Sequence, residues 1–517
     1  MSLRVSTHRL AVVAATLTAT LTVATAQWTL DSLAEPRFDM ASGTAGDMVF
    51  FAGANNHADT ILLYSPQTRQ WSVSFMSEGR NCPNNSICTD ASTLIVGGFL
   101  ANGSCSDRAD IYDVSSQAWS SFALSHPRCF VAMAEAGNEI LIAGGNSGQR
   151  SPVVDIYNQT TQAWRTDSLS VSRRGIAAAG VGQFAVFAGG YVGNTAVDTV
   201  DIYDSVSGSW STASLSQPAA VLTSTSSDQR AYFVSGRDST GGYSDIVDIF
   251  DAATQSWSRS RLSSATRVPS LVALDGKVYF IGGGSIVDVL DEQTNTWTQF
   301  QLTSNAASKC SAIVGDKILI SSLQEPVPPH GLPQYFSTVE IIDTSTQLLL
   351  KSELSLLRGQ VDAASVNGVA VFAGGIVPGV GLSDHVDIYE ELGTEFCPAT
   401  ANSTGRPAEL FAFGSRSISD NAIEMHAGPI PDSPAAFFYG PNQSQVPFGN
   451  GVLCVGSPRY RLGDPTRAHD LVAGVRVPSS LLSAIPGPLN FQCLYRDLAA
   501  GGSGFNASTA YRIEFVP

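Results

Sequence analysis

The tryptophans of this chain recur at a nearly constant interval. Neighbouring tryptophans among the 517 residues are separated by 40 to 48 positions, and they stand at Trp28, Trp71, Trp119, Trp164, Trp210, Trp257 and Trp297. A period of this length marks a structural unit that cannot bury its apolar face alone and stacks on copies of itself. The sequence therefore predicts an array of similar units.

Each unit carries the signals of four strands. An apolar run closed by glycine, as in residues 140–145, precedes an Asp-Ile-Tyr type of string whose aromatic stands seven residues before the tryptophan. The tryptophan lies in a strand of its own. A small-residue strand, such as residues 175–180, lies between each tryptophan and the next glycine pair and completes four strands per period. Such β-branched and aromatic runs ending in Gly indicate strands and turns. Two further glycine-strand units, at residues 318–322 and 369–375, bring the count to eight.

The Gly-Gly pair after the second strand, the aromatic in the third and the Trp in the fourth together resemble the kelch repeat family. The resemblance implies an all-β fold in which four-stranded blades form a closed β-propeller. Eight blades are expected, with seven as the alternative. Unit five departs from the pattern, because Val234-Ser235-Gly236 replaces the glycine pair.

A propeller must close, since an open ring leaves sheet edges unpaired. Trp28 has no glycine strand of its own upstream, so its strand is expected to complete the blade that begins near Val369. Phe396 is the competitor, because it stands seven residues after Tyr389. We favour Trp28, since nine residues separate it from Arg37, as at the internal junctions.

The ends of the chain predict secretion and a second domain. Arg4 and Arg9 precede an apolar stretch over residues 10–23 and then Ala24-Thr25-Ala26, the pattern of a signal peptide cleaved before Gln27. No transmembrane span is expected. We assign residues 1–26 to the signal peptide, 27–396 to the propeller, 397–407 to a linker and 408–517 to a small antiparallel β C-terminal domain. The last segment resembles a C-terminal β-domain of secreted bacterial multidomain proteins.

Composition limits the partners. The formal net charge is −16, which argues against nucleic acid and against anionic membrane surfaces. Six Asn-x-Ser/Thr sequons are glycosylation candidates: Asn84, Asn102, Asn158, Asn402, Asn442 and Asn506. Eight cysteines are compatible with disulfides in an oxidising compartment. Pairs of Cys82 with Cys88 and of Cys454 with Cys493 are guesses, and Cys310 is expected to be a lone thiol.

Arginine recurs near the position nine residues after the tryptophan, where one unit joins the next. The set is Arg37, Arg80, Arg128, Arg173, Arg267 and Arg358. At the mouth of a propeller channel these guanidinium groups could bind carboxylates or sulfates, a position that resembles the ligand-contacting arginines of some kelch propellers. The alternative is that each arginine pairs with an Asp or a carbonyl of the blades. The repeated Asp of the Asp-Ile-Tyr string is expected to serve the blade itself.

The sequence favours binding over catalysis. Secreted copper-radical oxidases also carry kelch blades, but the six histidines of the mature chain are scattered, and no motif of a catalytic or metal site appears. The proline-rich loop at residues 324–337 could bind or be a tolerated insertion. We expect a secreted, extracellular monomer without a cofactor, which recognises a protein or glycan, possibly acidic, through loops on one face. The alternative is an oxidase-like or carbohydrate-active enzyme on the same fold.

Overall fold

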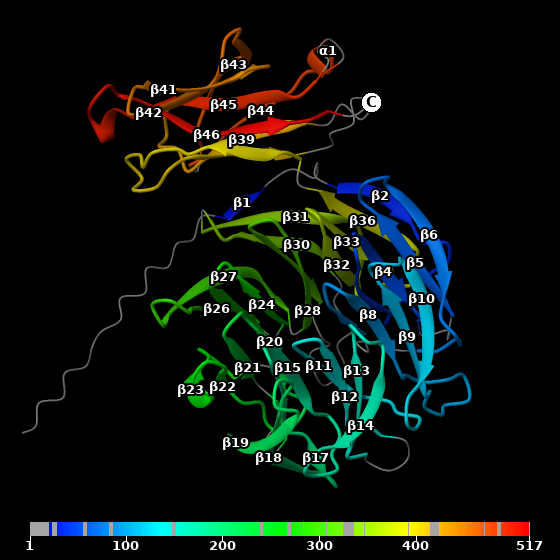
Figure 1. The fold of residues 1–517 in the computed structure, drawn as a ribbon. Coiled ribbons are helices and arrows are strands. Elements are labelled where there is room, and N and C mark those ends of the chain that lie inside the picture. Colours follow the sequence, from blue (N-terminus) through cyan, green and yellow to red (C-terminus); the bar gives the residue numbers. More distant parts are fainter. Residues whose placement is uncertain are drawn as a thin grey trace, which may run out of the picture.

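Eight four-stranded antiparallel sheets, here called blades 1 to 8, form a ring (Figure 1). The structure is a computed structural model that describes residues 20–22, 28–54, 59–81, 86–146, 151–234, 236–237, 241–265, 270–282, 284–306, 308–323, 336–345, 347–390, 392–413, 423–469, 471–482 and 487–515.

The strands of each blade run from the channel outward. Blade 1 is β3 (Ala41–Ala45), β4 (Met48–Ala52), β5 (Thr60–Ser65) and β6 (Gln70–Phe75). Blade 2 is β7 (Ser86–Cys88), β8 (Ser92–Val96), β9 (Arg108–Asp113) and β10 (Ala118–Ala123). Blade 3 is β11 (Ala132–Ala136), β12 (Glu139–Ala143), β13 (Val153–Asn158) and β14 (Trp164–Ser168). Blade 4 is β15 (Ala177–Val181), β16 (Phe184–Ala188), β18 (Thr195–Asp204) and β19 (Ser209–Ala219), with the short β17 (Tyr191–Val192) beside β18.

The second half of the ring repeats the order. Blade 5 is β20 (Thr223–Ser226), β21 (Arg230–Val234), β22 (Ile246–Asp251) and β23 (Ser256–Arg261). Blade 6 is β24 (Ser270–Leu274), β25 (Lys277–Ile281), β26 (Gly284–Asp291) and β27 (Thr296–Ala306). Blade 7 is β28 (Ser308–Val314), β29 (Lys317–Leu323), β30 (Phe336–Asp343) and β31 (Leu348–Arg358), whose edge also carries β1 (Thr20–Thr22) in parallel. Blade 8 is β32 (Asp362–Val366), β33 (Val369–Ala373), β36 (His385–Glu390) and β2 (Trp28–Ser32), with a ribbon of β34 (Ile376–Val377) and β35 (Gly381–Leu382).

The innermost strands follow one another around the channel. Each contacts the innermost strand of the next blade, and β3 of blade 1 contacts β32 of blade 8. Their Ser side chains join neighbouring blades: Ser42 Oγ donates to the Ala363 carbonyl (3.2 Å), and Ser224 Oγ to the Ala178 carbonyl (2.7 Å). Small residues recur in these strands because a large side chain would separate the blades.

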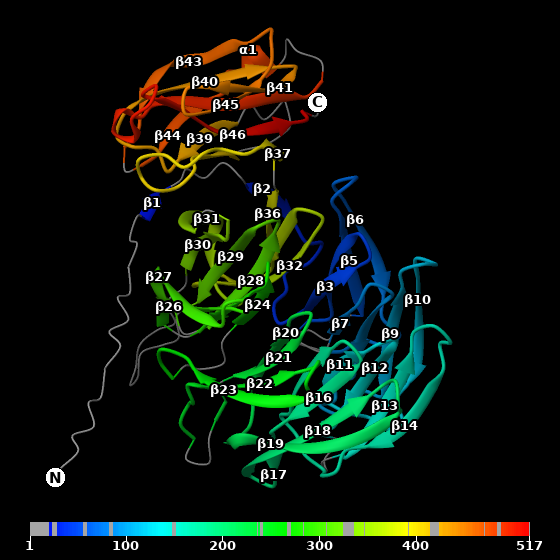
Figure 2. The same ribbon diagram turned by 60° about the vertical axis from the view of Figure 1, so that its left-hand side comes forward.

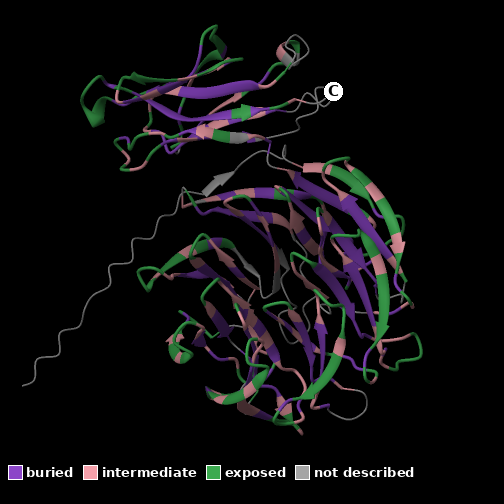
Figure 3. Ribbon diagram, in the orientation of Figure 1, coloured by how far each residue is buried: buried purple, intermediate pink, exposed green. Residues whose placement is uncertain are grey.

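Burial falls from the inside of each blade to its outer strand (Figure 3). All of β8 and β16 is buried, whereas β6 and β10 consist mostly of exposed residues with a few half-buried ones. The apolar clusters lie between blades: Phe50 and Leu63 of blade 1 pack with Ile95 and Tyr112 of blade 2. Blade contacts, more than any single central core, therefore bury the apolar surface that stabilises the ring.

The strand register places each tryptophan after Trp28 against the aromatic or aliphatic residue seven positions upstream. Trp119 is opposite Tyr112, Trp297 is opposite Leu290, and in blade 7 Leu349 occupies the tryptophan position opposite Ile342. The seven-residue spacing leaves room for a turn in which the residue two before Trp has positive φ, as at Gln117 (55°). The seven-residue spacing in the sequence therefore reflects the register of the hairpin formed by the third and fourth strands of a blade.

Trp28 closes the ring, as we favoured. It pairs with Tyr389 in the register Trp28↔Tyr389, with ring centroids 5.3 Å apart, and its Nε1 donates to Ser352 Oγ of blade 7 (2.7 Å). Phe396 does not compete, because its strand pairs with the C-terminal sheet. Eight blades and an all-β propeller are therefore confirmed, and seven blades are excluded.

The C-terminal residues form three sheets above the ends of blades 7 and 8 (Figures 1 and 2). The five-stranded sheet is β37 (Thr394–Cys397), β46 (Phe505–Ile513), β45 (Leu489–Arg496), β40 (Pro434–Gly440) and β43 (Tyr460–Arg467). The others are β38 (Glu409–Phe413), β39 (Glu424–Gly428) and β44 (Ala473–Arg476), and the hairpin of β41 (Gln443–Phe448) and β42 (Gly451–Val455). Two short helical turns, α1 (Ser479–Leu482) and the 3-10 turn η1 (Leu498–Ala500), complete it.

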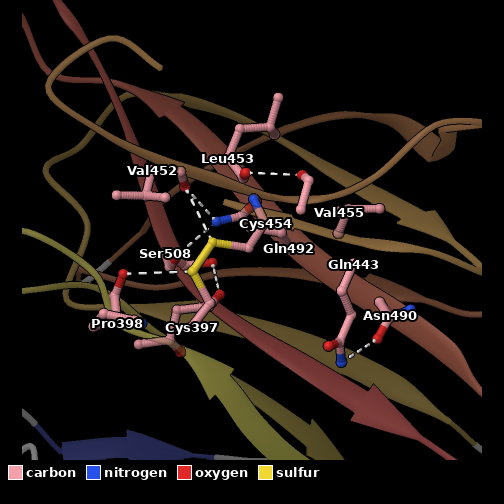
Figure 4. The surroundings of a disulfide bond; sticks show 12 residues. Cys397, Pro398, Gln443, Val452, Leu453, Cys454, Val455, Asn490, Gln492 and Ser508 are labelled. Carbon is pink, nitrogen blue, oxygen red and sulfur yellow. Dashed lines mark hydrogen bonds between the residues drawn. A yellow bond between two sulfur atoms is a disulfide. The ribbon is translucent and has the colours of Figure 1, made fainter. Parts of the chain in front are cut away.

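The C-terminal sheet begins earlier in the chain than the expected linker. Strand β37 starts at Thr394, and Leu392 already packs in the core of this domain. Cys397 of β37 forms a disulfide with Cys454 of β42 (Figure 4). Among the described residues, no helix combines the length and apolar content needed to cross a membrane.

We predict that Trp28→Ala lowers the free energy of unfolding by about 2–3 kcal/mol, because it removes a half-buried ring from the closing strand. Leu30→Ala is the matched control on the same strand, since Leu30 is 67% exposed, and it should change stability by less than about 0.5 kcal/mol. Denaturant unfolding of both variants measures the difference. Equal effects would show that Trp28 has no special place in closure.

Candidate functional site

Five of the six predicted arginines are buried structural residues. Arg37, Arg80, Arg128, Arg173 and Arg358 are each at most 1% exposed. Arg267 lies outside the described residues. A guanidinium without accessible surface offers no donor to a ligand, so these five side chains do not form the anion-binding ring that the sequence suggested. The alternative, pairing within the blades, is what the structure shows.

The Asp of the Asp-Ile-Tyr string is the partner of the arginine. Arg80 Nη2 lies 2.5 Å from Asp110 Oδ2 and Arg358 Nη2 lies 2.7 Å from Asp387 Oδ2, and Arg128 with Asp155 and Arg173 with Asp201 repeat the pair. The other carboxylate oxygen accepts the backbone N–H of the incoming junction, as from Ser77 to Asp110 (2.8 Å). One carboxylate thus joins the entering chain and its arginine to the blade.

The environment of these pairs is nearly dry. Burial lowers the pKa of Arg128, Arg173 and Arg358, while the facing carboxylates raise it. Other Nη donors go to carbonyls, for example from Arg173 Nη1 to Gly189 (2.7 Å), whereas the buried Nε of each of these arginines has no hydrogen-bond partner among the described residues. Arg37 differs because Leu62 replaces the Asp of its blade; it donates instead to Thr60 and Gly53.

The glycine pair is explained by the same junction. Gly97 has φ 59°, and a Cβ there would collide with the Arg128 carbonyl oxygen of the next junction. The N–H of the second glycine donates to this kind of carbonyl, as from Gly375 to Arg37 (2.8 Å). Glycine is required because the backbone of the neighbouring blade passes directly against it.

The residues just beyond the junction differ between blades. In blades 2, 3, 4, 5 and 8, the residue after the arginine position forms a β-bridge with the residue after the glycine position. This bridge extends the pairing of the first two strands of the blade beyond their ends. These glycine-following residues, which we call the rim, are Phe99, Asn146, Tyr191, Arg237 and Ile376.

Two arginines and two tyrosines gather on the rim of blades 4 and 5. The Arg174 guanidinium lies 5.3 Å from the centroid of the Tyr191 ring, and that of Arg237 lies 5.7 Å from the Tyr243 ring. Arg237 is exposed, and its Nη2 donates to Tyr243 Oη (3.4 Å), which raises the arginine pKa. We call these four residues the Arg–Tyr cluster.

The two halves of the cluster share one surface. The Val221 N–H donates to the Gly175 carbonyl (3.0 Å), and a Cβ on Gly175 would touch both Val221 and Tyr191. Val221 is 45% exposed although it is apolar, and its φ is 57°, a strained value for a β-branched residue. Neither Arg174 nor Arg237 forms an ion pair with another residue that the structure describes.

An aromatic pair continues the rim on blades 2 and 3. The rings of Phe99 and Phe130 meet edge to face at 5.2 Å, and Phe130 is 58% exposed with φ 55°. The disulfide between Cys105 and Cys129 ties this loop to the junction. The rim from blade 2 to blade 5 therefore presents aromatic rings and two guanidinium groups.

The sequence reasoning chose Arg173 and missed Arg174. The available signal was variation: the residue that follows the junction arginine changes from blade to blade, as Asn81, Cys129, Arg174 and Gly359 do, whereas Arg173 belongs to the repeat. A residue that recurs at the same position in every blade has a structural role in the blade. A residue that varies at an accessible position can instead contact a ligand.

The glycosylation candidates fall into two groups. Asn102 and Asn442 are exposed and Asn158 is half-buried. Asn402 is 6% exposed, with its Nδ2 bonded to the Pro429 carbonyl (2.7 Å), and Asn506 is fully buried. Neither of these two amides can carry a glycan in this fold, which corrects the expectation. Asn84 lies outside the described residues.

One of the two guessed cysteine pairs is wrong. Cys454 bonds to Cys397 and leaves Cys493 as a buried thiol. Cys88 forms no disulfide with a described cysteine, while Cys82 lies outside the described residues, and Cys310 is a free thiol in β28 as expected. Burial raises the pKa of Cys310 to about 12.

The described histidines do not converge. No group of three or more His, Cys, Asp or Glu side chains suited to a metal ion occurs among the residues that the structure describes. His57 and His330, with most of the proline-rich loop, lie outside that part of the chain.

These features define the class: an eight-bladed β-propeller with an antiparallel β C-terminal domain. The family model of the Kelch motif matches residues 127–166, which span the junction arginine and Trp164 of blade 3. Kelch repeats indicate a propeller of the protein-binding kind.

Comparisons with whole proteins add little to this. No curated protein matches the chain. A solved structure titled "Structure of YjhT" is similar over 51% of this chain and 95% of its own, with 15% identity and a TM-score of 0.36. The blade count therefore rests on the strand pairing of this chain alone.

We predict that Arg128→Met destabilises the fold by about 3–5 kcal/mol, because it leaves Asp155 buried without its partner. The double variant Arg128→Met with Asp155→Asn should recover part of this loss, since the unpaired charge is gone. Arg174→Ala is the matched control at the half-buried neighbour of Arg173, and it should stay within about 0.5 kcal/mol because Arg174 forms no ion pair with a described residue. A stable Arg128→Met variant would reopen a ligand role for the junction arginines.

Proposed function

We propose that this protein is a secreted binding protein that recognises an acidic extracellular protein or glycan at the Arg–Tyr cluster. The observation that carries the proposal is the pairing of Arg174 with Tyr191 and of Arg237 with Tyr243 at the rim. Stacked guanidinium groups keep their edges available for bidentate bonds to carboxylates or sulfates. The aromatic rings supply the apolar contact that a sugar ring or a peptide side chain needs.

Charge contrast supports an acidic ligand. The whole chain carries a formal net charge of −16, so an anion approaching at random is repelled. Two arginines side by side on a rigid rim make a local exception to this field. A ligand with two acidic groups would therefore distinguish this place from the rest of the surface.

The C-terminal domain leaves the rim open. It lies against Asp316, Lys317 and Asp343, which stand at the turns of blade 7. Because strands alternate in direction, these turns are at the opposite end of the blade from the junction arginines and the rim. Ligand access to the Arg–Tyr cluster does not require movement of this domain.

Secretion is supported by the N-terminal pattern and by the cysteines. Strand β2 begins at Trp28, directly after the expected cleavage before Gln27. Cleavage there would release the closing strand without shortening it. Two cysteine pairs at disulfide distance agree with an oxidising compartment.

We predict that the double variant Arg174→Ala/Arg237→Ala loses at least tenfold in affinity for the best acidic ligand. Each charge-assisted hydrogen bond contributes about 1.5–3 kcal/mol, and about 1.4 kcal/mol corresponds to a factor of ten. The probes are an array of sulfated and uronic-acid glycans and a set of Asp- and Glu-rich peptides, with affinity measured by surface plasmon resonance.

The matched control is Arg165→Ala/Arg261→Ala, which removes the same charge from outer strands. Both arginines form surface ion pairs there, with Glu139 and Asp245. This control should bind like the parent protein. An equal loss in both double variants would reduce the effect to overall charge, and no binding to any acidic probe would refute the proposed function.

A further inference from the structure

The outward face of the five-stranded C-terminal sheet carries apolar side chains where polar ones are expected. Along β40, Phe437 faces the core of the domain, so Ala436 and Phe438 on either side of it face outward. Leu494 of β45 is paired with Ala436 and therefore lies on the same face. The open face of an antiparallel sheet is normally polar. The core of the domain does not account for these three residues.

The hairpin of β41 and β42 covers only one half of this face (Figure 4). Gln492, two positions before Leu494 on β45, is fully buried beneath the hairpin. Its Nε2 donates to the Val452 carbonyl and its Oε1 accepts the Cys454 N–H, both at 2.8 Å. The hairpin thus buries a polar side chain and leaves apolar ones accessible, so burial of apolar surface does not explain the outward face.

The uncovered half forms a pocket of about 270 Å³, which we call the outer-face pocket. The side chains that give it its character are Ala436, Phe438, Phe448, Leu494, Arg496 and Phe505. Tyr495 also borders it, but its hydroxyl lies in the core and accepts from Asn402 Nδ2 (3.0 Å). No Asp, Glu or Lys is among the lining residues that the structure describes, so Arg496 is the one charged group on these walls.

Two phenylalanines at the border of the pocket are held in place by the backbone. The Asn450 N–H donates to the Phe505 carbonyl (2.8 Å), and a Cβ on Gly449 would lie 2.6 Å from the same oxygen. The turn that follows Phe448 is therefore seated directly against Phe505. Phe448 is 37% and Phe505 is 44% exposed, so both rings present apolar surface at a fixed place before any ligand binds.

Arg496 supplies a cation at the same border. It is directly opposite Phe505 in the pairing of β45 with β46, and its guanidinium lies 5.6 Å from the centroid of the Phe505 ring. Arg496 is exposed and forms no ion pair with another residue that the structure describes. A guanidinium that stacks on an aromatic ring keeps its edge donors for an anion.

The C-terminal domain lacks the excess negative charge of the propeller. Residues 397–517 contain eight Arg, no Lys and eight Asp or Glu, which gives no net formal charge, whereas the whole chain carries −16. An anion can therefore approach the outer-face pocket without the repulsion that the propeller exerts.

The size and the walls of the pocket select its ligand. Small-molecule pockets usually measure about 300–1,000 Å³, so this one accommodates a short apolar group. A sugar would need several hydrogen-bonding side chains, and the described walls offer only Arg496. A stable protein partner would need about 800 Å² of contact surface. The apolar surface ends beside Pro434, where Arg467 Nε pairs with Asp432 Oδ1 (2.9 Å).

We propose that the outer-face pocket binds a small monocarboxylate with an apolar tail. The tail lies on the apolar sheet face beside the two phenylalanines, and the carboxylate pairs with Arg496. The apolar outward face, the preformed pocket and the unpaired guanidinium carry this inference. The pocket is in a different domain from the Arg–Tyr cluster, so the inference does not depend on the ligand proposed there.

Ligand-detected NMR titration of the full chain at pH 7 tests the site with octanoate and 3-phenylpropanoate, each compared with its uncharged primary amide. Each acid should bind about fivefold more tightly than its amide, the upper end of what an accessible ion pair contributes. Arg496→Gln should lose this preference and leave amide binding unchanged. Phe448→Ala should weaken acid and amide alike, because it removes apolar contact and no charge.

Arg512→Gln is the matched control, because Arg512 is an exposed arginine near the other end of β46 and does not line the pocket. It should keep the preference for the acid. Equal affinities of acid and amide in the parent protein would overturn the proposal, as would an Arg496→Gln variant that retains the preference. Absence of saturable binding of both acids would refute it too, even if an acetylated peptide with a Phe-Asp pair bound. Circular dichroism establishes that each variant is folded.

Discussion

The pairing of β2 with β36 is the constraint on which the rest of the structure depends. Blade 8 takes its outer strand from the beginning of the propeller and its other three from the end, so no blade order is possible until both ends of this segment meet. The cluster of Phe51, Leu62, Val371 and Ile388 is buried only after this step, because its members come from blades 1 and 8. Closure of the ring therefore joins the similar sheets into one cooperative folding unit.

Within the ring, the junction pair of arginine and aspartate fixes how one blade follows another. The carboxylate of Asp110 accepts from the backbone of Ser77 and pairs with Arg80, so both the entry of the chain and its direction are specified by one side chain. The described pairs stand at the entries of blades 2, 3, 4 and 8, and blade 1 has Leu62 in place of the Asp. In blade 5, where Ala219 occupies the arginine position, Asp248 still accepts the backbone N–H of Ser216 (3.2 Å). The carboxylate can therefore hold the entering chain without the arginine.

The features that are the same in every repeat could be predicted from the sequence. The hairpin register, eight blades and the closing role of Trp28 all followed from spacing, because each expresses local strand pairing that recurs. What differs between units was not predictable in the same way. Arg174 and Tyr191 are 17 residues apart in the chain, and their contact depends on a bridge that only the folded rim creates.

The same reasoning explains the errors. Cys397 and Cys454 are separated by 57 residues and meet through the order of strands in a sheet that has no internal period. The burial of Asn402 and Asn506 depends on that sheet as well. Arg173 was chosen as a ligand residue for its recurrence, yet recurrence is the mark of a residue that the blade itself requires.

The two ends of the propeller are therefore under different physical control. At the rim, Arg174 and Arg237 lie on tyrosine rings, so binding of an acidic ligand there should weaken as the salt concentration rises. At the opposite end, the turns of blade 7 lie against the C-terminal domain, where burial and the neighbouring carboxyl groups raise the pKa of Glu409. The strands of a blade alternate in direction, so the ring separates these two places. A ligand at the rim and the C-terminal domain therefore do not compete for the same surface of the propeller.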